Sequence, residues 1–129
     1  MCCGDNFTIG INEGRLFGWG INDFGQLGDT TISYYDMPKL LDERNDWIKI
    51  SCGEGFFCAI RSNGELYTCG KGSNGQIGNG LQNAINDSLY FVGDGFTHVS
   101  CGYNHVLAKK QYLLYGWGQN KNKQLINIE

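Results

Sequence analysis

Proline, basic charge and long apolar runs are all scarce in this chain of 129 residues. It holds a single proline, which excludes a proline-rich linker, and its net charge of −3 comes without any Lys/Arg cluster that could hold nucleic acid by charge. No apolar run approaches the roughly 20 residues that a membrane-spanning helix needs. The first residues lack the basic segment and apolar core of a signal peptide. We therefore expect an intracellular protein, cytoplasmic or nuclear, with no membrane partner and no direct nucleic-acid partner.

Glycine, in contrast, is abundant, at 20 residues, and it recurs in a pattern. Cys-Gly pairs begin at Cys3, Cys52 and Cys101, so that each pair lies 49 residues after the one before. Turns of the Gly-Gln-Leu-Gly type occupy 25–28 and 75–78, and 123–126 repeats them with both glycines replaced. A fixed period near 50 indicates one supersecondary unit copied in tandem. The units are expected at about 1–46, 47–95 and 96–129, within a single repeat domain.

Each unit shows the two-residue alternation of short strands, joined by tight turns such as Asn63-Gly64. In the middle unit the expected strands are 48–52, 56–60, 65–70 and a weaker one at 89–92. The matching strands are 7–11, 16–20 and 37–41 in the first unit, and 97–101, 106–109 and 112–118 in the third. Tandem four-stranded units predict an all-β fold, a partial β-propeller of about three four-stranded antiparallel blades.

The repeated motif is apolar-x-Cys-Gly-x-x-aromatic/His, then Asn-Gly-x-Leu-Tyr-x-x-Gly, then Gly-Gln-Leu-Gly. It resembles the regulator of chromosome condensation repeat family across nearly the whole chain. The resemblance implies a seven-bladed β-propeller, of which three units are present. The family often carries histidine three residues after the first glycine; His105 fits, whereas Phe7 and Phe56 replace it in the other units.

The six cysteines are expected to be reduced and buried, because most of them occupy apolar strand positions. Gly53 is expected to be structurally necessary, so that Gly53→Val destabilises the fold, whereas Lys71 has no expected task beyond solvation.

Several motifs resemble sites of chemistry, but the repeat explains them better. Residues 70–75 match the dinucleotide fingerprint, yet the sequence after them is unsuited to the helix that the fingerprint requires. His98, Cys101 and His105 have spacing suited to zinc, but alternate residues of a strand point to opposite faces. We therefore expect no catalytic, cofactor-binding or metal-binding residues, and no enzyme activity.

The variable segments 29–36 and 79–87 are the best places for recognition, because loops on a rigid scaffold commonly carry it. The candidate partner-binding residues are Tyr34, Tyr35, Asp36, Asn83 and Asp87. The alternative is that the two tyrosines simply pack on the edge of a blade.

The sequence is interpreted as a non-enzymatic protein–protein interaction module. The family resemblance implies a protein partner, such as a small GTPase or a chromatin component. The alternative is a guanine-nucleotide exchange factor for a Ran-like GTPase, and a third interpretation is a structural fragment without activity. Three blades would expose apolar faces, so we expect either self-association or a longer chain. The terminal segment 125–128 is expected to be part of an incomplete blade.

Overall fold

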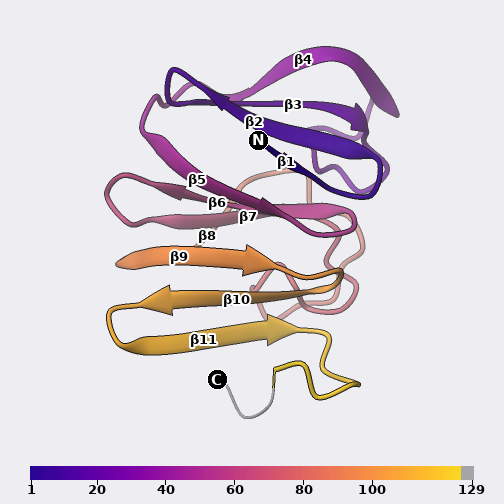
Figure 1. Cartoon of the computed structure of the whole chain (residues 1–129). Helices are drawn as coiled ribbons and strands as arrows, with labels where there is room; N and C mark the ends of the chain where they lie inside the picture. Colours follow the sequence, from indigo (N-terminus) through magenta and orange to yellow (C-terminus); the bar gives the residue numbers. More distant parts are fainter. Residues whose placement is uncertain (126–129) are drawn as a thin grey trace.

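In the computed structural model, which describes residues 1–125, the chain forms three stacked antiparallel β-sheets, here named blades 1, 2 and 3 (Figure 1). Blade 1 contains β1 (Cys2–Cys3), β2 (Phe7–Asn12), β3 (Arg15–Ile21) and β4 (Tyr34–Asp42). Blade 2 contains β5 (Trp47–Cys52), β6 (Phe56–Arg61), β7 (Leu66–Gly70) and β8 (Tyr90–Gly93). Blade 3 contains β9 (Phe96–Cys101), β10 (His105–Lys110) and β11 (Leu113–Gly118). Within the described residues, no helix is long and apolar enough to cross a membrane.

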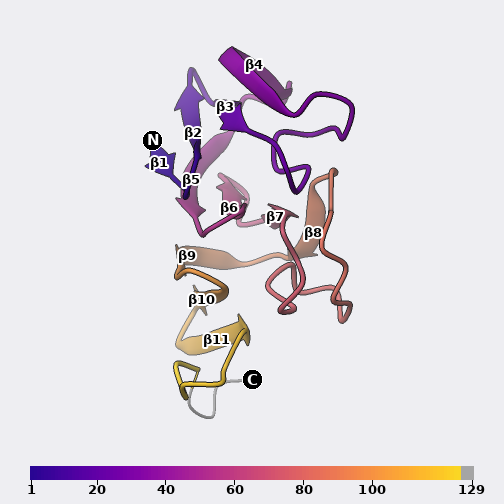
Figure 2. The ribbon, with the colours of Figure 1, turned by 90° about the vertical axis from the view of Figure 1, so that its right-hand side faces the viewer.

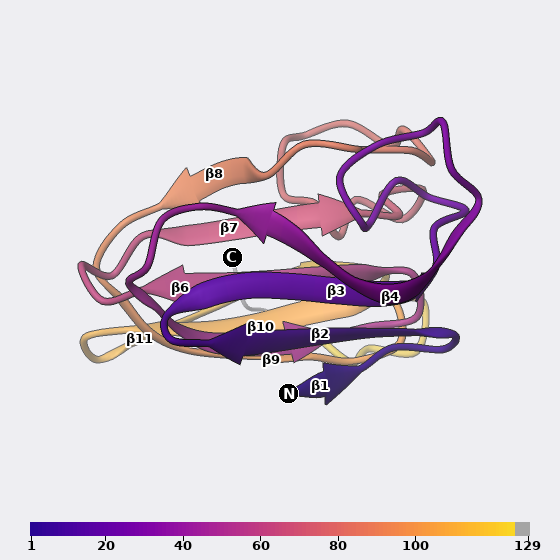
Figure 3. The same ribbon diagram turned by 90° about the horizontal axis from the view of Figure 1, so that it is seen from above.

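The strands follow one another in sequence order across each blade. The first strands, β1, β5 and β9, lie along one edge of the stack, on the left in Figure 2. The outer strands β4 and β8 lie on the opposite side, together with the long loops that precede them (Figures 2 and 3). The loops are therefore concentrated at one side of the molecule.

All three blades have the same strand register. Phe7 pairs with Gly20, Phe56 with Gly70, and His105 with Gly118. The predicted all-β, partial-propeller fold is confirmed, with the difference that blade 3 has three strands within the described residues. Of the terminal segment 125–128, residues 126–128 lie outside the described part of the chain. The unit boundaries given above stay a prediction.

The described part of the third turn, residues 123–125, keeps the geometry of the first two although Lys123 replaces a glycine. The side-chain Oε1 of Gln26, Gln76 and Gln124 accepts the backbone N–H two residues earlier, at 2.9, 2.8 and 3.0 Å. Lys123 adopts a φ of 63°, close to the 80° of Gly75 at the equivalent position. The glutamine side chain therefore organises this turn in every unit.

Two apolar clusters hold the stack together, one at each junction between blades. The cluster between blades 1 and 2 contains Phe7, Ile9, Leu16, Leu27, Trp47, Phe57, Ala59 and Cys69. The cluster between blades 2 and 3 contains Phe56, Cys58, Ile60, Leu66, Ile77, Phe96, Val106 and Ala108. Residues of a single strand alternate between the two clusters, as Phe56 and Phe57 do on β6. Blade 2 is thus apolar on both faces, because it has a neighbour on each side.

The expectation of six free cysteines is wrong for one pair, because Cys2 and Cys52 form a disulfide with a Cα–Cα distance of 5.8 Å. The repeat brings them together across the junction of blades 1 and 2. At the next junction the equivalent neighbours are Ser51 and Cys101, where the Ser51 Oγ accepts the Cys101 N–H at 2.9 Å. Cys3, Cys58, Cys69 and Cys101 are free thiols.

The structure gives a physical basis for the expected constraint at Gly53 and contradicts the expected role of Lys71. A Cβ on Gly53 would lie 2.1 Å from the Phe56 ring and 2.8 Å from the Gly102 carbonyl oxygen, so the constraint is close packing. Lys71 is not merely solvated, because its ammonium pairs with Glu54 and lies 5.3 Å from the centroid of the Phe24 ring. The expectation that Lys71 is only solvated is wrong, because its side chain connects the turn between β5 and β6 to the loop that follows β3.

Candidate protein-binding surface

The outer strands β4 and β8 and their preceding loops form a surface that we name the rim surface, residues 22–42 and 71–93 (Figures 2 and 3). Of the 14 large apolar residues that are exposed in the described part of the chain, eight belong to it. They are Ile32, Tyr34, Met37, Leu40, Leu81, Ile85, Tyr90 and Phe91. Such a concentration of exposed apolar side chains on one side of a molecule is typical of an interaction site.

The first loop of the rim surface is held from within by the buried side chain of Asn22. Its Nδ2 donates to the carbonyl oxygens of Asp29 at 2.7 Å and Ile32 at 2.9 Å, while its Oδ1 accepts the Leu27 N–H at 2.8 Å. A buried amide that makes three such bonds fixes the loop in one conformation. The loop therefore presents Ile32 and Tyr34 from a rigid base.

A second anchor joins the same loop to β4 through Tyr35, Asp29 and Lys39. The Tyr35 hydroxyl donates to the Asp29 carboxylate, and this bond together with burial raises the tyrosine pKa to about 12. The same bond, with weaker help from Lys39, lowers the pKa of Asp29. Lys39 also donates to the Leu27 carbonyl oxygen at 2.7 Å. Tyr35 thus serves the scaffold, whereas its neighbour Tyr34 is exposed.

The second loop rests on blade 2 and on the first loop. Asn86 exchanges hydrogen bonds with Gly70, donating from Nδ2 to its carbonyl oxygen and accepting its N–H, both at 2.9 Å. The Asn86 N–H donates to the Phe24 carbonyl oxygen at 3.3 Å, which links the two loops directly. The rim surface is consequently one continuous feature that spans two blades.

The five predicted partner-binding residues all lie on the rim surface, but their roles differ. Tyr34 is 60% exposed and Asp36 is exposed, whereas Tyr35 packs on the blade edge as the alternative expected. All three lie on β4, because this strand begins three residues earlier than predicted, with Tyr34 pairing with Ile21. Asn83 and Asp87 are exposed on the second loop. No hydrogen bond within the described residues joins the three β4 residues to the other two.

The rim surface carries an excess of negative charge. Its acidic residues are Asp23, Asp29, Asp36, Asp42 and Asp87, and its basic residues are Lys39 and Lys71. Both lysines are already paired, with Asp29 and Glu54 respectively. The charge that remains available to a partner is therefore that of exposed carboxylates beside apolar side chains.

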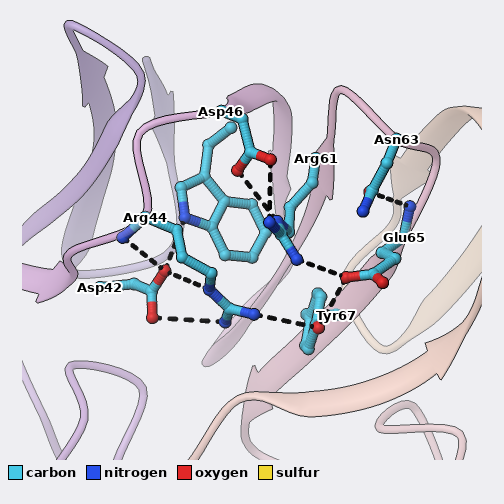
Figure 4. Close-up of polar contacts among 8 residues, drawn as sticks. Asp42, Arg44, Asp46, Arg61, Asn63, Glu65 and Tyr67 are labelled. Atoms are coloured by element: carbon cyan, nitrogen blue, oxygen red, sulfur yellow. Dashed lines mark hydrogen bonds and ion pairs between the residues drawn. The ribbon is translucent and has the colours of Figure 1, made fainter.

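Sequence reasoning missed a polar network that ties the linker between blades 1 and 2 to the hairpin of blade 2 (Figure 4). Arg61 donates from Nε and Nη2 to both Asp46 oxygens at 2.9 Å and from Nη1 to Glu65 at 2.6 Å. These bonds, led by that to Asp46, raise the pKa of Arg61, and the Arg61 bond lowers the pKa of Asp46. The hydroxyl of Tyr67 also donates to Glu65, at 2.9 Å, and lowers its pKa.

Arg44 forms the other half of this network. Its guanidinium lies 4.9 Å from the Tyr67 ring centroid and 5.3 Å from that of Trp47, and it donates to Asp42 at 2.8 Å. Burial acts to raise the pKa of Asp42, but hydrogen bonds from Arg44 and Trp47 outweigh it and lower that pKa. The sequence signal is the group of charged residues within 42–46, which does not reveal partners 15 and 23 residues away. Every charge in the network has a partner, so its role is structural.

The buried thiols are poorly suited to nucleophilic chemistry. Burial raises the pKa of Cys69 to about 12 and raises that of Cys58 well above its ordinary value. Both thiols therefore stay protonated at neutral pH, and the thiolate is the nucleophilic form. The two histidines have different surroundings. The His105 ring packs against Gly102, as the Phe56 ring packs against Gly53. His98 Nδ1 lies 2.9 Å from the Thr97 hydroxyl.

Comparison with known proteins identifies the repeat. The family model of the regulator of chromosome condensation (RCC1) repeat matches residues 13–60 and 63–108, and a second model of the same repeat matches 47–76. Each of the longer matches begins in the hairpin of one blade and ends in the second strand of the next.

Similar proteins are much longer than this chain. It is 30% identical over 128 residues to the E3 ubiquitin-protein ligase HERC2 of Mus musculus, which covers 94% of this chain and 3% of that protein. Human WBSCR16 has a fold with a TM-score of 0.80, at 24% identity, over 92% of this chain and 33% of its own. Prp20p from Saccharomyces cerevisiae, described with its binding to Gsp1p and histones, has a TM-score of 0.77 and 25% identity over 90% of this chain and 32% of its own. With its repeated register, its recurrent turns and these family matches over more than half its length, the chain belongs to the regulator of chromosome condensation repeat family.

Proposed function

We propose that this chain is a non-enzymatic protein-binding module that contacts a basic protein surface through its rim surface. The observation that carries the proposal is the set of exposed apolar side chains on β4, β8 and their loops. The sheets and the Asn22 and Asn86 hydrogen bonds hold these side chains in place. Preorganised tyrosine and apolar contacts bind with little loss of conformational entropy.

The exposed carboxylates indicate the chemistry of the partner. Asp36 and Asp87 are exposed beside these apolar residues, whereas the lysines of the rim surface are already paired. Electrostatic complementarity favours a partner that presents Lys or Arg around an apolar patch. A chromatin component such as a histone fits this description, and Prp20p, which shares the fold, binds histones.

The test is a binding titration of the purified chain against core histones at two ionic strengths. We expect affinity to fall with added salt, and Tyr34→Ala and Asp36→Lys each to weaken binding about tenfold, a factor that corresponds to about 1.4 kcal/mol. Tyr112→Ala is the matched control, because Tyr112 is 99% exposed at the hairpin of blade 3, away from the rim surface. Equal binding by all four proteins would contradict the proposal.

Nucleotide exchange on a Ran-like GTPase is the second candidate, favoured by the binding of Prp20p to Gsp1p. The two functions separate in one assay, the release of labelled GDP from the GTPase in the presence of this chain. Binding without acceleration supports the module proposed above, and faster release supports exchange.

A further inference from the structure

The two junctions within the stack are built from the same pair of faces. Each blade has a forward face, which meets the following blade, and a backward face, which meets the preceding one. At the first junction Ile9 and Leu16 of the forward face share a cluster with Phe57 and Ala59 of the backward face. At the second, Cys58 and Leu66 occupy the places of Ile9 and Leu16, as the strand register shows. The stack is therefore a repeated head-to-tail contact.

Within residues 1–125, no blade covers the forward face of blade 3. Leu114 occupies the register position of Leu16 and Leu66, yet it is 54% exposed where the other two are fully buried. Leu107 takes the position of Ile9 and Cys58 and is only half-buried, whereas those two residues are fully buried. Two leucines thus occupy positions that the fold buries elsewhere.

The backward face of blade 1 likewise has no blade against it in the described part of the chain. Gly10, Phe17 and Trp19 take the positions of Ala59, Tyr67 and Cys69. Together with Met1 they line an apolar hollow of about 310 Å³. On the backward face, Gly10 is smaller than the residue that blade 2 or blade 3 has at the same register position. On the forward face of blade 3, Leu107 is a large apolar residue. In a further junction of the same register, Leu107 would lie opposite Gly10, as Ile9 lies in one cluster with Ala59.

Hydrogen-bonding groups match in the same way. At the second junction the Trp117 indole donates to the Gln76 carbonyl oxygen at 2.8 Å. Trp19 holds the register position of Trp117, and Gln124 repeats the turn geometry of Gln76. In a further junction of this kind, Trp19 would donate to the Gln124 carbonyl oxygen.

The turns that follow the first strands β1, β5 and β9 add a backbone contact between blades. The N–H of Asp5 donates to the Glu54 carbonyl oxygen at 3.1 Å, and the N–H of Glu54 donates to that of Tyr103 at 2.9 Å. The next step of this series would join the Tyr103 N–H to the carbonyl oxygen of Asp5. Both residues are exposed at opposite ends of the stack.

We propose that the backward face of blade 1, centred on Trp19, binds the forward face of blade 3, centred on Leu114, of a second copy of this chain. The second copy is the occupant because the contact continues two junctions that the chain already makes with the same register. Two copies that each contribute three blades would form the contact twice and close a ring of six blades with two-fold symmetry, one blade fewer than the family resemblance implies. This inference is independent of the rim surface and of its partner.

The test is light scattering of the whole chain at micromolar concentration, where we expect a mass twice the 14.4 kDa of one chain. Trp19→Glu and Leu114→Glu should each give monomers, because each removes both contacts of the ring. Tyr112→Glu, a change outside both faces, should leave the dimer intact. Circular dichroism of every variant shows whether it has folded, and Trp19→Phe, which keeps the apolar face, should retain the dimer.

Mixing the two monomeric variants gives the decisive result. Trp19→Glu still has an intact blade 3 face, and Leu114→Glu still has an intact blade 1 face, so the mixture should recover one contact and form a heterodimer. A dimer built from two identical faces would instead be disrupted by only one of the two variants. A folded wild-type chain that stays monomeric, or that grows beyond two copies, would overturn the proposal.

Discussion

Blade 2 and blade 3 share a repeat but differ in how far they are buried. The residues 56–60 of β6 are all buried, with exposed fractions between 0 and 1%. On β10, the equivalent residues 105–109 alternate between buried and partly or fully exposed. The difference follows from position, because within residues 1–125 blade 2 has a neighbour on each face and blade 3 has one. The apolar residues of a blade are therefore buried by the neighbouring blades as much as by the strands of the blade itself.

The hairpins of the two blades show the same contrast. In blade 2 the hairpin is tied to the preceding linker by Arg44 and Arg61, which are fully paired. In blade 3 the hairpin turns at Gln111, with a φ of 56°, and carries exposed Tyr112 and Leu113. Blade 2 is therefore the most constrained part of the molecule.

The largest expected effect compares Leu66→Ala with Leu114→Ala, two changes at one register position. Leu66 is fully buried and its loss should lower the free energy of unfolding by about 2–5 kcal/mol. Leu114 is 54% exposed, so its loss should cost under about 1 kcal/mol in dilute, monomeric protein. Urea unfolding of both variants measures the difference. Similar losses would show that the two blades are equally buried in solution.

The second comparison concerns the junction disulfide. Cys52→Ser should lower the free energy of unfolding of the oxidised chain by roughly 2–4 kcal/mol, because the bond constrains a long loop of the unfolded state. Cys101→Ser, at the equivalent position with a free thiol, is the control and should cost less. Mass spectrometry of protein that is unfolded and alkylated without reduction should find one disulfide, Cys2–Cys52, and four alkylated cysteines. Six alkylated cysteines would remove the disulfide from the account.

The third comparison separates the effect of close packing at Gly53 from that of ion pairing at Lys71. Gly53→Val should destabilise the chain by about 1–3 kcal/mol, because its side chain would displace the Phe56 ring or the backbone of blade 3. Lys71→Ala should cost about 1 kcal/mol, since it removes one partly buried ion pair with Glu54. Thermal unfolding ranks the two variants. A larger shift for Lys71→Ala would mean that the glycine position is more adaptable than its contacts indicate.

The smallest expected effect is a pH dependence in the network of blade 2. Because Arg61 lowers the pKa of Asp46, the ionised carboxylate stabilises the fold above the unfolded pKa of about 3.9 and stops doing so as the pH falls through its lower folded value. Asp46→Asn should therefore cost under about 1 kcal/mol at pH 7. The gap between the variant and the wild type should close at acid pH. A gap that persists at pH 2 would assign the effect to packing.

The sequence predicts the blades well because their cause is local and repeated. The two-residue alternation, the Asn63-Gly64 hairpin and the 49-residue spacing of the Cys-Gly pairs all bear on the same strands. Contacts between blades were harder to anticipate. The Cys2–Cys52 bond and the Lys71–Glu54 pair join residues whose proximity depends on how one sheet is stacked on another.

The sequence predicts the exposure of the candidate loops, and their role in binding stays a prediction. The loops were correctly expected at the surface, and Tyr34 is exposed there. Whether Tyr34 or Tyr35 turns inward depends on where β4 begins, and the bulge between Gly18 and Gly20 sets that register. The sequence does not show which of the two side chains turns inward, because both residues are tyrosines and have the same polarity.

The most direct test of the account is amide hydrogen exchange at several protein concentrations. In dilute protein, the amides of β6 and β7 should be protected more strongly than those of β10 and β11, because among the described residues blade 2 alone has a blade on each face. Raising the concentration should increase the protection of β10 and β11 while that of β6 changes little, as the second copy covers the face of blade 3. Equal protection of β6 and β10 at every concentration would contradict the account.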